Sequence, residues 1–138
     1  MDPLSIAAGS LAVITTLAKT SCLIKEFVRT YRAARSDLSN LNQEINDLEI
    51  ILHAIHDAAS DETFAKAAVP MGLQDQLTTV IASCNGLVGE IFTMLDEYRS
   101  VDRFAHWASI GKKRVKEQVA LLEGYRKILD MSLTAIDL

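Results

Sequence analysis

The feature that most constrains the fold is an uncharged run of sixteen residues, from Pro3 to Ala18. As a helix it spans about 24 Å, which is less than the roughly 30 Å hydrocarbon core of a bilayer. Extended to Ile24 it spans about 33 Å with Lys19 as its single charge, near enough to one boundary to reach the headgroups. Burial of each large aliphatic side chain contributes about 1.5–3 kcal/mol. The contribution is similar whether the side chain is buried in lipid or in a protein core. The segment therefore fits either a bundle core or a membrane.

Helical periodicity extends through nearly the whole sequence. Asp2 followed by Pro3 is typical of a helix start, because Asp supplies an N-cap oxygen and Pro lacks only an N–H that would be unpaired there. We expect this helix to reach about Ala34. Three more helices are predicted: one after Ser36, one from Leu73 to about Ser100, and one after a connector that spans Asp102 to Gly111. With no strict alternation typical of strands, residues 1–138 are predicted to form one all-α domain. It is a helical bundle of four to five helices with a long, apolar N-terminal helix.

The first helix is apolar on more than one face, which is typical of a helix at the centre of a bundle or in a membrane. One face is traced by Leu4, Ala8, Leu11, Thr15, Ala18 and Cys22. Another is traced by Ile6, Val13, Leu17, Ile24, Val28 and Tyr31. Inside the third helix, Gly86 and Gly89 cost helix propensity, about 1 kcal/mol each, and are expected to let a neighbouring helix come close.

Composition excludes several classes of protein. The chain has 49% hydrophobic residues, too many for a disordered segment, and a net charge of −4, which argues against nucleic acid as a partner. Cys22 and Cys84 have no metal or redox spacing, so a reducing, intracellular setting is expected. The N-terminus has no positively charged region of a secretory signal.

Motifs that carry catalysis are missing from the sequence. There is no G-x-S-x-G or H-E-x-x-H pattern, and Gly111-Lys112-Lys113 is no phosphate loop, because His106 stands where that loop needs its first glycine. His53 and His56, with Asp57, have a spacing that could begin a metal site, but a third strong ligand is not evident. We therefore expect no enzymatic activity, no metal and no cofactor.

Charge is segregated along the chain. Residues 36–65 hold seven acids and no Lys or Arg, whereas Arg99 to Lys116 holds six bases and one acid. The tail of the first helix is a second basic segment, with Lys19, Lys25, Arg29, Arg32 and Arg35 against Glu26. The candidate patch for a lipid or protein partner consists of Arg103, Trp107, Lys112, Lys113, Arg114 and Lys116. Trp favours membrane interfaces, and each base near an anionic surface contributes about 1 kcal/mol. The alternative is a solvated helix start with Trp107 packed in the core.

Three passages resemble the HeLo-like N-terminal domains of fungal STAND (NLR-like) proteins. They are the opening Met1-Asp2-Pro3-Leu4-Ser5-Ile6-Ala7-Ala8-Gly9, the polar-to-aliphatic segment from Asn42 to Ile55, and the closing segment. In the closing segment Phe104-Ala-His-Trp107 precedes the basic patch, and an amphipathic helix ends in the Ser-Leu-rich Ile128 to Leu133. The resemblance covers essentially all 138 residues.

The resemblance implies a helical bundle that carries out regulated cell death, including heterokaryon incompatibility. Such domains assemble on activation, and their N-terminal helix is thought to permeabilise the plasma membrane. Here that role falls on Leu4 to Ile24, with the membrane-targeting side chains Leu4, Ile6, Leu11, Val13, Ile14 and Leu17. The expected partners are a second copy of the chain, anionic membrane lipids and other NLR/STAND signalling modules, and the expected location is the cytoplasm and then the plasma membrane.

Two other functions stay open. In the first, the chain is a non-lytic interaction module, in which Lys112, Lys113, Arg114 and Lys116 contact Asp47 or Glu49 of a neighbouring copy. In the second, it is a structural bundle without its own activity. The chain ends about where the family domain ends, so we expect the N-terminal effector domain of a longer protein.

Overall fold

A computed structural model describes residues 3–61, 64 and 68–136, and this part of the chain contains helices and no strand. Four long helices account for most of it: α1 (Pro3–Thr30), α2 (Arg35–Ser60), α4 (Met71–Tyr98) and α6 (Lys112–Ile136). Three short ones connect them: the 3-10 turn η1 (Arg32–Ala34), α5 (Val101–Phe104) and the π-helical turn η2 (Trp107–Gly111). The predicted all-α bundle with a long, apolar first helix is confirmed.

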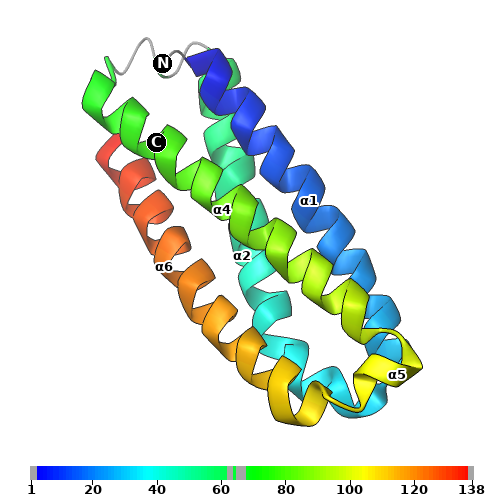
Figure 1. Cartoon of the computed structure of the whole chain (residues 1–138). Helices are drawn as coiled ribbons and strands as arrows, with labels where there is room; N and C mark the ends of the chain where they lie inside the picture. Colours follow the sequence, from blue (N-terminus) through cyan, green and yellow to red (C-terminus); the bar gives the residue numbers. More distant parts are fainter. Residues whose placement is uncertain (1–2, 62–63, 65–67, 137–138) are drawn as a thin grey trace.

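The four long helices form an elongated bundle (Figure 1). α1 packs against α2 and α4, and α6 packs against the same two helices from the other side. Because neighbouring helices along the chain run in opposite directions, four helix termini meet at one end of the bundle: the C-termini of α1 and α4 and the N-termini of α2 and α6 (Figure 1). The short elements η1, α5 and η2 close this end.

The core follows the periodicity of the sequence. In α2, every aliphatic position with three- or four-residue spacing is buried: Leu38, Leu41, Ile45, Leu48, Leu52 and Ile55. In α6 the fully or nearly buried aliphatics are spaced by seven residues: Val115, Leu122, Leu129 and Ile136. A seven-residue repeat keeps one side of a helix facing its neighbours, which explains why α6 lies along the bundle rather than across it.

The first helix ends earlier than predicted. It stops at Thr30 rather than near Ala34, because Tyr31 leaves the helical region of backbone angles (φ −124°, ψ 82°). The Tyr31 ring stacks on Phe104 with 3.7 Å between centroids, and its hydroxyl donates a hydrogen bond of 2.8 Å to the Arg99 carbonyl. These contacts hold the turn into α2. The predicted N-cap at Asp2 lies outside the described residues.

Two expectations about the middle of the chain need correction. The third long helix begins at Met71, two residues before the predicted start, directly after Pro70. A Cβ atom placed on Gly86 or Gly89 would meet no other atom within 4 Å, so neither glycine receives a neighbouring helix. The close helix approach occurs instead at Gly9, where a Cβ would lie 3.3 Å from the Cγ2 of Ile81.

Candidate functional site

The structure separates the two predicted faces of α1. The face that begins with Ile6 points into the bundle, and Ile6, Val13, Leu17 and Ile24 are buried there. The other, here called the outer face of α1, is exposed throughout: Leu4, Ala8, Leu11, Thr15, Ala18 and Cys22. Leu4 retains 73% and Leu11 52% of its surface, and no charged residue separates them.

The predicted membrane-targeting residues are therefore divided between two environments. Ile6, Val13 and Leu17 belong to the core, Leu4 and Leu11 to the outer face, and Ile14 is half-buried between them. Sequence periodicity predicts both faces, but it does not distinguish the buried face from the exposed one, because both have apolar residues at helical spacing. Only the packing of α2 and α4 against one side decides which leucines are covered.

Length and composition alone would let two helices cross a membrane. α1 and α4 each contain an 18-residue stretch of high mean hydropathy, 1.5 and 1.3, and about a third of the first stretch and 44% of the second are buried. The core helix of a soluble bundle has the same properties, so hydropathy does not decide between the two settings. α1 has a further property that mean hydropathy does not describe: its outer face is exposed and carries no charge.

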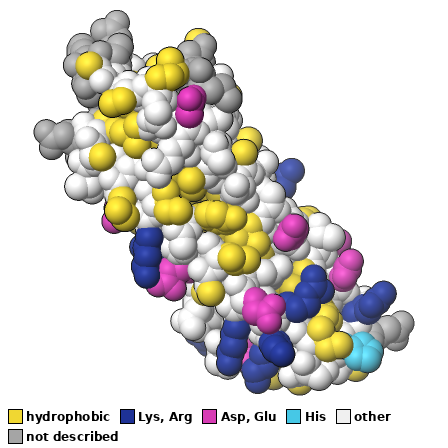
Figure 2. Space-filling model, turned by 60° about the vertical axis from the view of Figure 1, so that its left-hand side comes forward, with side chains coloured by type: hydrophobic (Ala, Val, Ile, Leu, Met, Phe, Trp, Pro, Cys, Tyr) yellow, Lys and Arg dark blue, Asp and Glu magenta, His cyan; other side chains and the backbone are white. Residues whose placement is uncertain are grey.

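The fold brings the two basic segments of the sequence together. Ten of the fourteen Lys and Arg residues lie near the end of the bundle where the four helix termini meet, here called the basic end. They are Lys25, Arg29, Arg32, Arg35, Arg99, Arg103, Lys112, Lys113, Arg114 and Lys116, and all are exposed. Figure 2 shows most Lys and Arg side chains of the visible face at the lower end, with hydrophobic side chains above them. Sequence reasoning found both segments but not that they meet.

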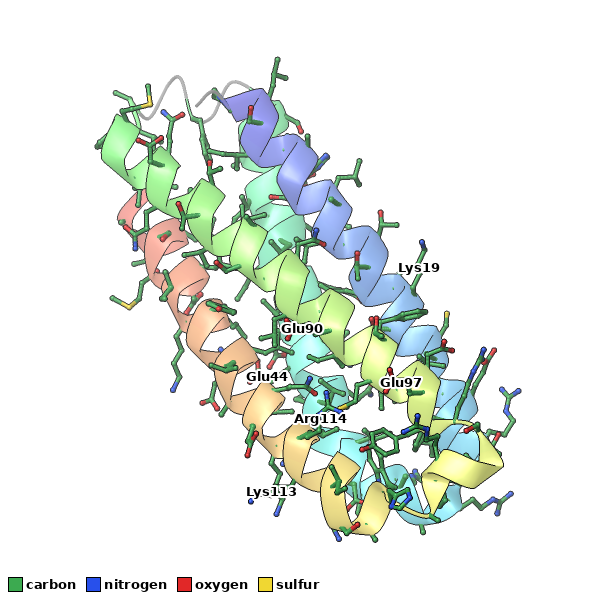
Figure 3. The ribbon with its side chains drawn as sticks, viewed as in Figure 1. Lys19, Glu44, Glu90, Glu97, Lys113 and Arg114 are labelled. Atoms are coloured by element: carbon green, nitrogen blue, oxygen red, sulfur yellow. The ribbon has the colours of Figure 1, made fainter. Side chains whose placement is uncertain are left out.

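Few of these cations have an acidic partner. Lys112 lies 3.6 Å from Asp37, and Arg99 pairs with Asp96 at 2.9 Å and Glu26 at 3.6 Å. The other eight make no ion pair with any described residue. Lys113 and Arg114 project from the start of α6 (Figure 3). Most cations of the basic end therefore have no compensating carboxylate at ion-pair distance among the described residues, which gives this end a positive potential.

Trp107 does not belong to the exposed patch. It is 3% exposed, and its ring centroid lies 4.9 Å from that of Phe27 and 5.6 Å from that of Tyr98. Its Nε1 donates a 3.0 Å hydrogen bond to Asp37. The alternative with Trp107 in the core is therefore correct for this structure. Among the described side chains of the connector, Ile110 is a large apolar one that is exposed, at 50%, and sequence reasoning did not single it out.

One partly buried ion pair also escaped the sequence analysis. Arg126 of α6 donates hydrogen bonds of 2.8 and 3.2 Å to the two carboxylate oxygens of Glu44 in α2. This hydrogen bonding raises the pKa of the Arg126 guanidinium, and the bidentate geometry ties the two helices together. Asp47, proposed as a contact for a neighbouring copy, accepts a 3.0 Å hydrogen bond from Gln43.

The residues with metal-ligating or nucleophilic side chains include the histidines of α2 and Cys84. These contain no group of three or more His, Cys, Asp or Glu placed to hold a metal ion. His56 lies 3.4 Å from Asp57, and His53 is exposed on the same helix. Burial raises the pKa of the Cys84 thiol to about 12, which keeps it protonated and unreactive at neutral pH.

Comparison with known proteins gives one family. The family model described as "Pigment biosynthesis cluster protein PigL N-terminal" matches residues 1–138. No curated protein and no solved structure gives a significant match.

Proposed function

The chain belongs to the PigL N-terminal family, and from this premise we propose that it is a HeLo-like effector domain of fungal regulated cell death. This family is an N-terminal domain family of fungi related to the HeLo-like domains. In this proposal the domain forms the N-terminal part of an NLR-like protein. On activation it moves from the cytoplasm to the plasma membrane, assembles with further copies, and permeabilises the membrane through α1.

The observation that carries the proposal is the outer face of α1. Leu4 and Leu11 are exposed on a stretch without charges, and α1 continues directly into the exposed cations Lys19, Lys25 and Arg29. Lys19 projects from α1 away from the bundle (Figure 3). An exposed apolar face next to cations suits a helix that lies at the surface of an anionic membrane. Each cation near such a surface contributes about 1 kcal/mol.

Permeabilisation requires more than contact by the outer face. The inner face of α1 buries Ile6, Val13, Leu17 and Phe27 among others, and burial of such side chains contributes about 1.5–3 kcal/mol each. Release of α1 therefore costs a large part of the stability of a domain this size. We propose that assembly and membrane insertion together offset this cost, as a shift between two populations.

Dye release from liposomes tests the proposal. The wild-type chain should release dye from anionic vesicles and much less from neutral ones, and Leu11→Asp should abolish release while the chain stays folded. Leu121→Asp in α6 is the matched control, because Leu121 is 55% exposed and Leu11 52%, and it should release dye like the wild type. Circular dichroism checks folding. Undiminished release by folded Leu11→Asp, or equal loss in Leu121→Asp, contradicts the role of α1.

A second candidate is supported by the cations of α6. Lys113, Arg114 and Lys116 are exposed and have no ion-pair partner among the described residues, so they suit an acidic surface of another copy. If the chain is an interaction module, the triple variant Lys113→Glu, Arg114→Glu and Lys116→Glu should prevent assembly in lipid-free buffer. Under the effector proposal the same change should spare assembly and weaken binding to anionic vesicles. Light scattering and vesicle co-sedimentation separate the two.

A further inference from the structure

A hollow of 410 Å³ lies between the C-terminal half of α1 and the N-terminal half of α2, at the basic end. Its apolar base consists of Ile24 and Leu38, which are buried, and Val28, which is half-buried. Three cations surround that base: Lys25 and Arg29 from α1, and Arg35 from the first turn of α2. This volume lies in the range of small-molecule sites.

The three cations have no internal partner. None of them makes an ion pair or a side-chain hydrogen bond with a residue that the structure describes. A second hollow of the same volume, between α1 and α4, differs in this respect, because acids line it beside Lys19 and Arg99. There Arg99 already pairs with Glu26 and Asp96. The first hollow therefore combines an apolar base with three uncompensated positive charges.

We propose that the hollow between α1 and α2 binds one anionic phospholipid, with its phosphate on Lys25, Arg29 and Arg35 and part of an acyl chain against Ile24, Val28 and Leu38. Guanidinium groups bind phosphate oxygens through two parallel hydrogen bonds, and the Lys ammonium adds a point charge. The apolar base favours a lipid over free phosphate. A hollow of this volume also favours a single lipid over a peptide helix, whose diameter is about 10–12 Å.

This inference rests on the proposed membrane function and deepens it. Lys25 and Arg29 lie on the same helix as the outer face of α1, about two to three turns beyond Ala18 and about four to five turns beyond Leu11. A lipid held in the hollow would fix the C-terminal half of α1 at the headgroups. The outer face would then meet the membrane at a defined position along the helix.

Soluble short-chain lipids test the site without vesicles. The folded chain is titrated with dihexanoyl phosphatidylserine, dihexanoyl phosphatidylcholine and inorganic phosphate, with amide chemical shifts as the readout. We expect phosphatidylserine to shift the signals of residues 24–42. We expect the other two ligands to bind at least about tenfold more weakly, because one lacks net negative charge and the other lacks an acyl chain.

Two pairs of variants assign the binding to the hollow. Lys25→Gln with Arg29→Gln and Arg35→Gln should weaken phosphatidylserine binding about hundredfold, since each base near a lipid phosphate contributes about fivefold. Lys113→Gln with Arg114→Gln and Lys116→Gln removes the same charge from the basic end and should change binding less than about threefold.

The second pair leaves the charge unchanged. Ser39→Trp places a large side chain into the hollow and should abolish binding, because Ser39 lines it. Asn40→Trp, at the exposed neighbouring position, should bind like the wild type. Unfolding curves confirm that both variants fold.

Three results would overturn the proposal: equal loss of binding in both triple variants, equal affinity for inorganic phosphate, and lipid binding by Ser39→Trp. If the Lys25, Arg29 and Arg35 variant instead loses self-association in lipid-free buffer, the hollow is a protein-docking site. The proposed function fails separately. Short-chain lipid binding without dye release contradicts only the effector function, whereas dye release that depends on Leu11, without short-chain binding, contradicts only the site.

Discussion

Replacement of Gly111 by Ala tests whether the packing of Trp107 holds the basic end together. Gly111 has no positive φ, so its backbone accepts an alanine. A Cβ at this position would, however, lie 2.5 Å from Cε3 and 3.1 Å from Cζ3 of Trp107, and 3.2 Å from Cε2 of Tyr98. The Trp107 ring must move by about 1 Å to regain ordinary contact. That shift would strain its 3.0 Å hydrogen bond to Asp37.

The expected cost follows from these contacts. Overpacking of a core position costs about 1–3 kcal/mol, and loss of a hydrogen bond to a charged group about 1.5–3 kcal/mol. Against this, Ala in place of a helical Gly gains about 0.5–1 kcal/mol. We therefore expect Gly111→Ala to lower the free energy of unfolding by about 2–4 kcal/mol. The control Gly124→Ala should change the free energy of unfolding in the opposite direction. Gly124 is exposed in α6 and a Cβ there meets nothing within 4 Å, so this variant should be more stable by about 0.5–1 kcal/mol.

Urea unfolding followed by far-ultraviolet circular dichroism measures both variants, and the fluorescence of Trp107, the single tryptophan, reports on its surroundings. In folded Gly111→Ala we expect a shifted emission spectrum that Gly124→Ala does not show. Gly111→Ala as stable as Gly124→Ala, with unchanged emission, would refute the inferred packing at the basic end.

Further predictions concern buried polar groups. At neutral pH a maleimide should label the exposed Cys22 and spare Cys84 until the chain is unfolded, as mass spectrometry can show. The pKa of the Cys84 thiol rises from its ordinary 9.0 to about 12 in the folded chain, so unfolding releases a proton between these values. The free energy of unfolding should consequently fall as the pH rises from 9 toward 12, and Cys84→Ala should remove this thiol contribution. Glu44→Gln should lower stability by about 1–2 kcal/mol, because it weakens the paired hydrogen bonds from Arg126, whereas Glu123→Gln, at an exposed pair, should change stability much less.

The sequence was sufficient to predict most of the fold, because helix periodicity is local. The spacing of Leu38, Leu41 and Ile45 predicts one buried face of α2 whatever lies against it, and all three are buried. Helix ends were less predictable, since tertiary contacts set them. The end of α1 depends on Tyr31 stacking on Phe104, more than seventy residues later in the chain. No local pattern around Thr30 carries that information.

The candidate site was only partly predictable for a similar reason. Charge runs showed the cations near Arg29 and Lys113, but only the antiparallel arrangement of the helices places both runs at one end. A Trp near Lys112 and Lys113 is equally typical of a membrane interface and of a helix start with the Trp in the core. In the structure Trp107 takes the core position, where its indole N–H donates a hydrogen bond to Asp37. The pair of Glu44 with Arg126 joins residues 82 positions apart, so no spacing rule could find it.

Under the proposed function, the two faces of α1 separate membrane contact from membrane insertion. Contact through Leu4, Leu11 and the cations leaves the core intact, because none of these side chains is buried. Insertion must remove Ile6, Val13 and Leu17 from the contacts with α2 and α4, at a cost that is a large part of the stability of a typical domain. A chain with these two faces can therefore rest on a membrane in its folded state. Under the proposed function, the activating signal need not create the membrane-binding surface, and it has only to lower the cost of opening the bundle.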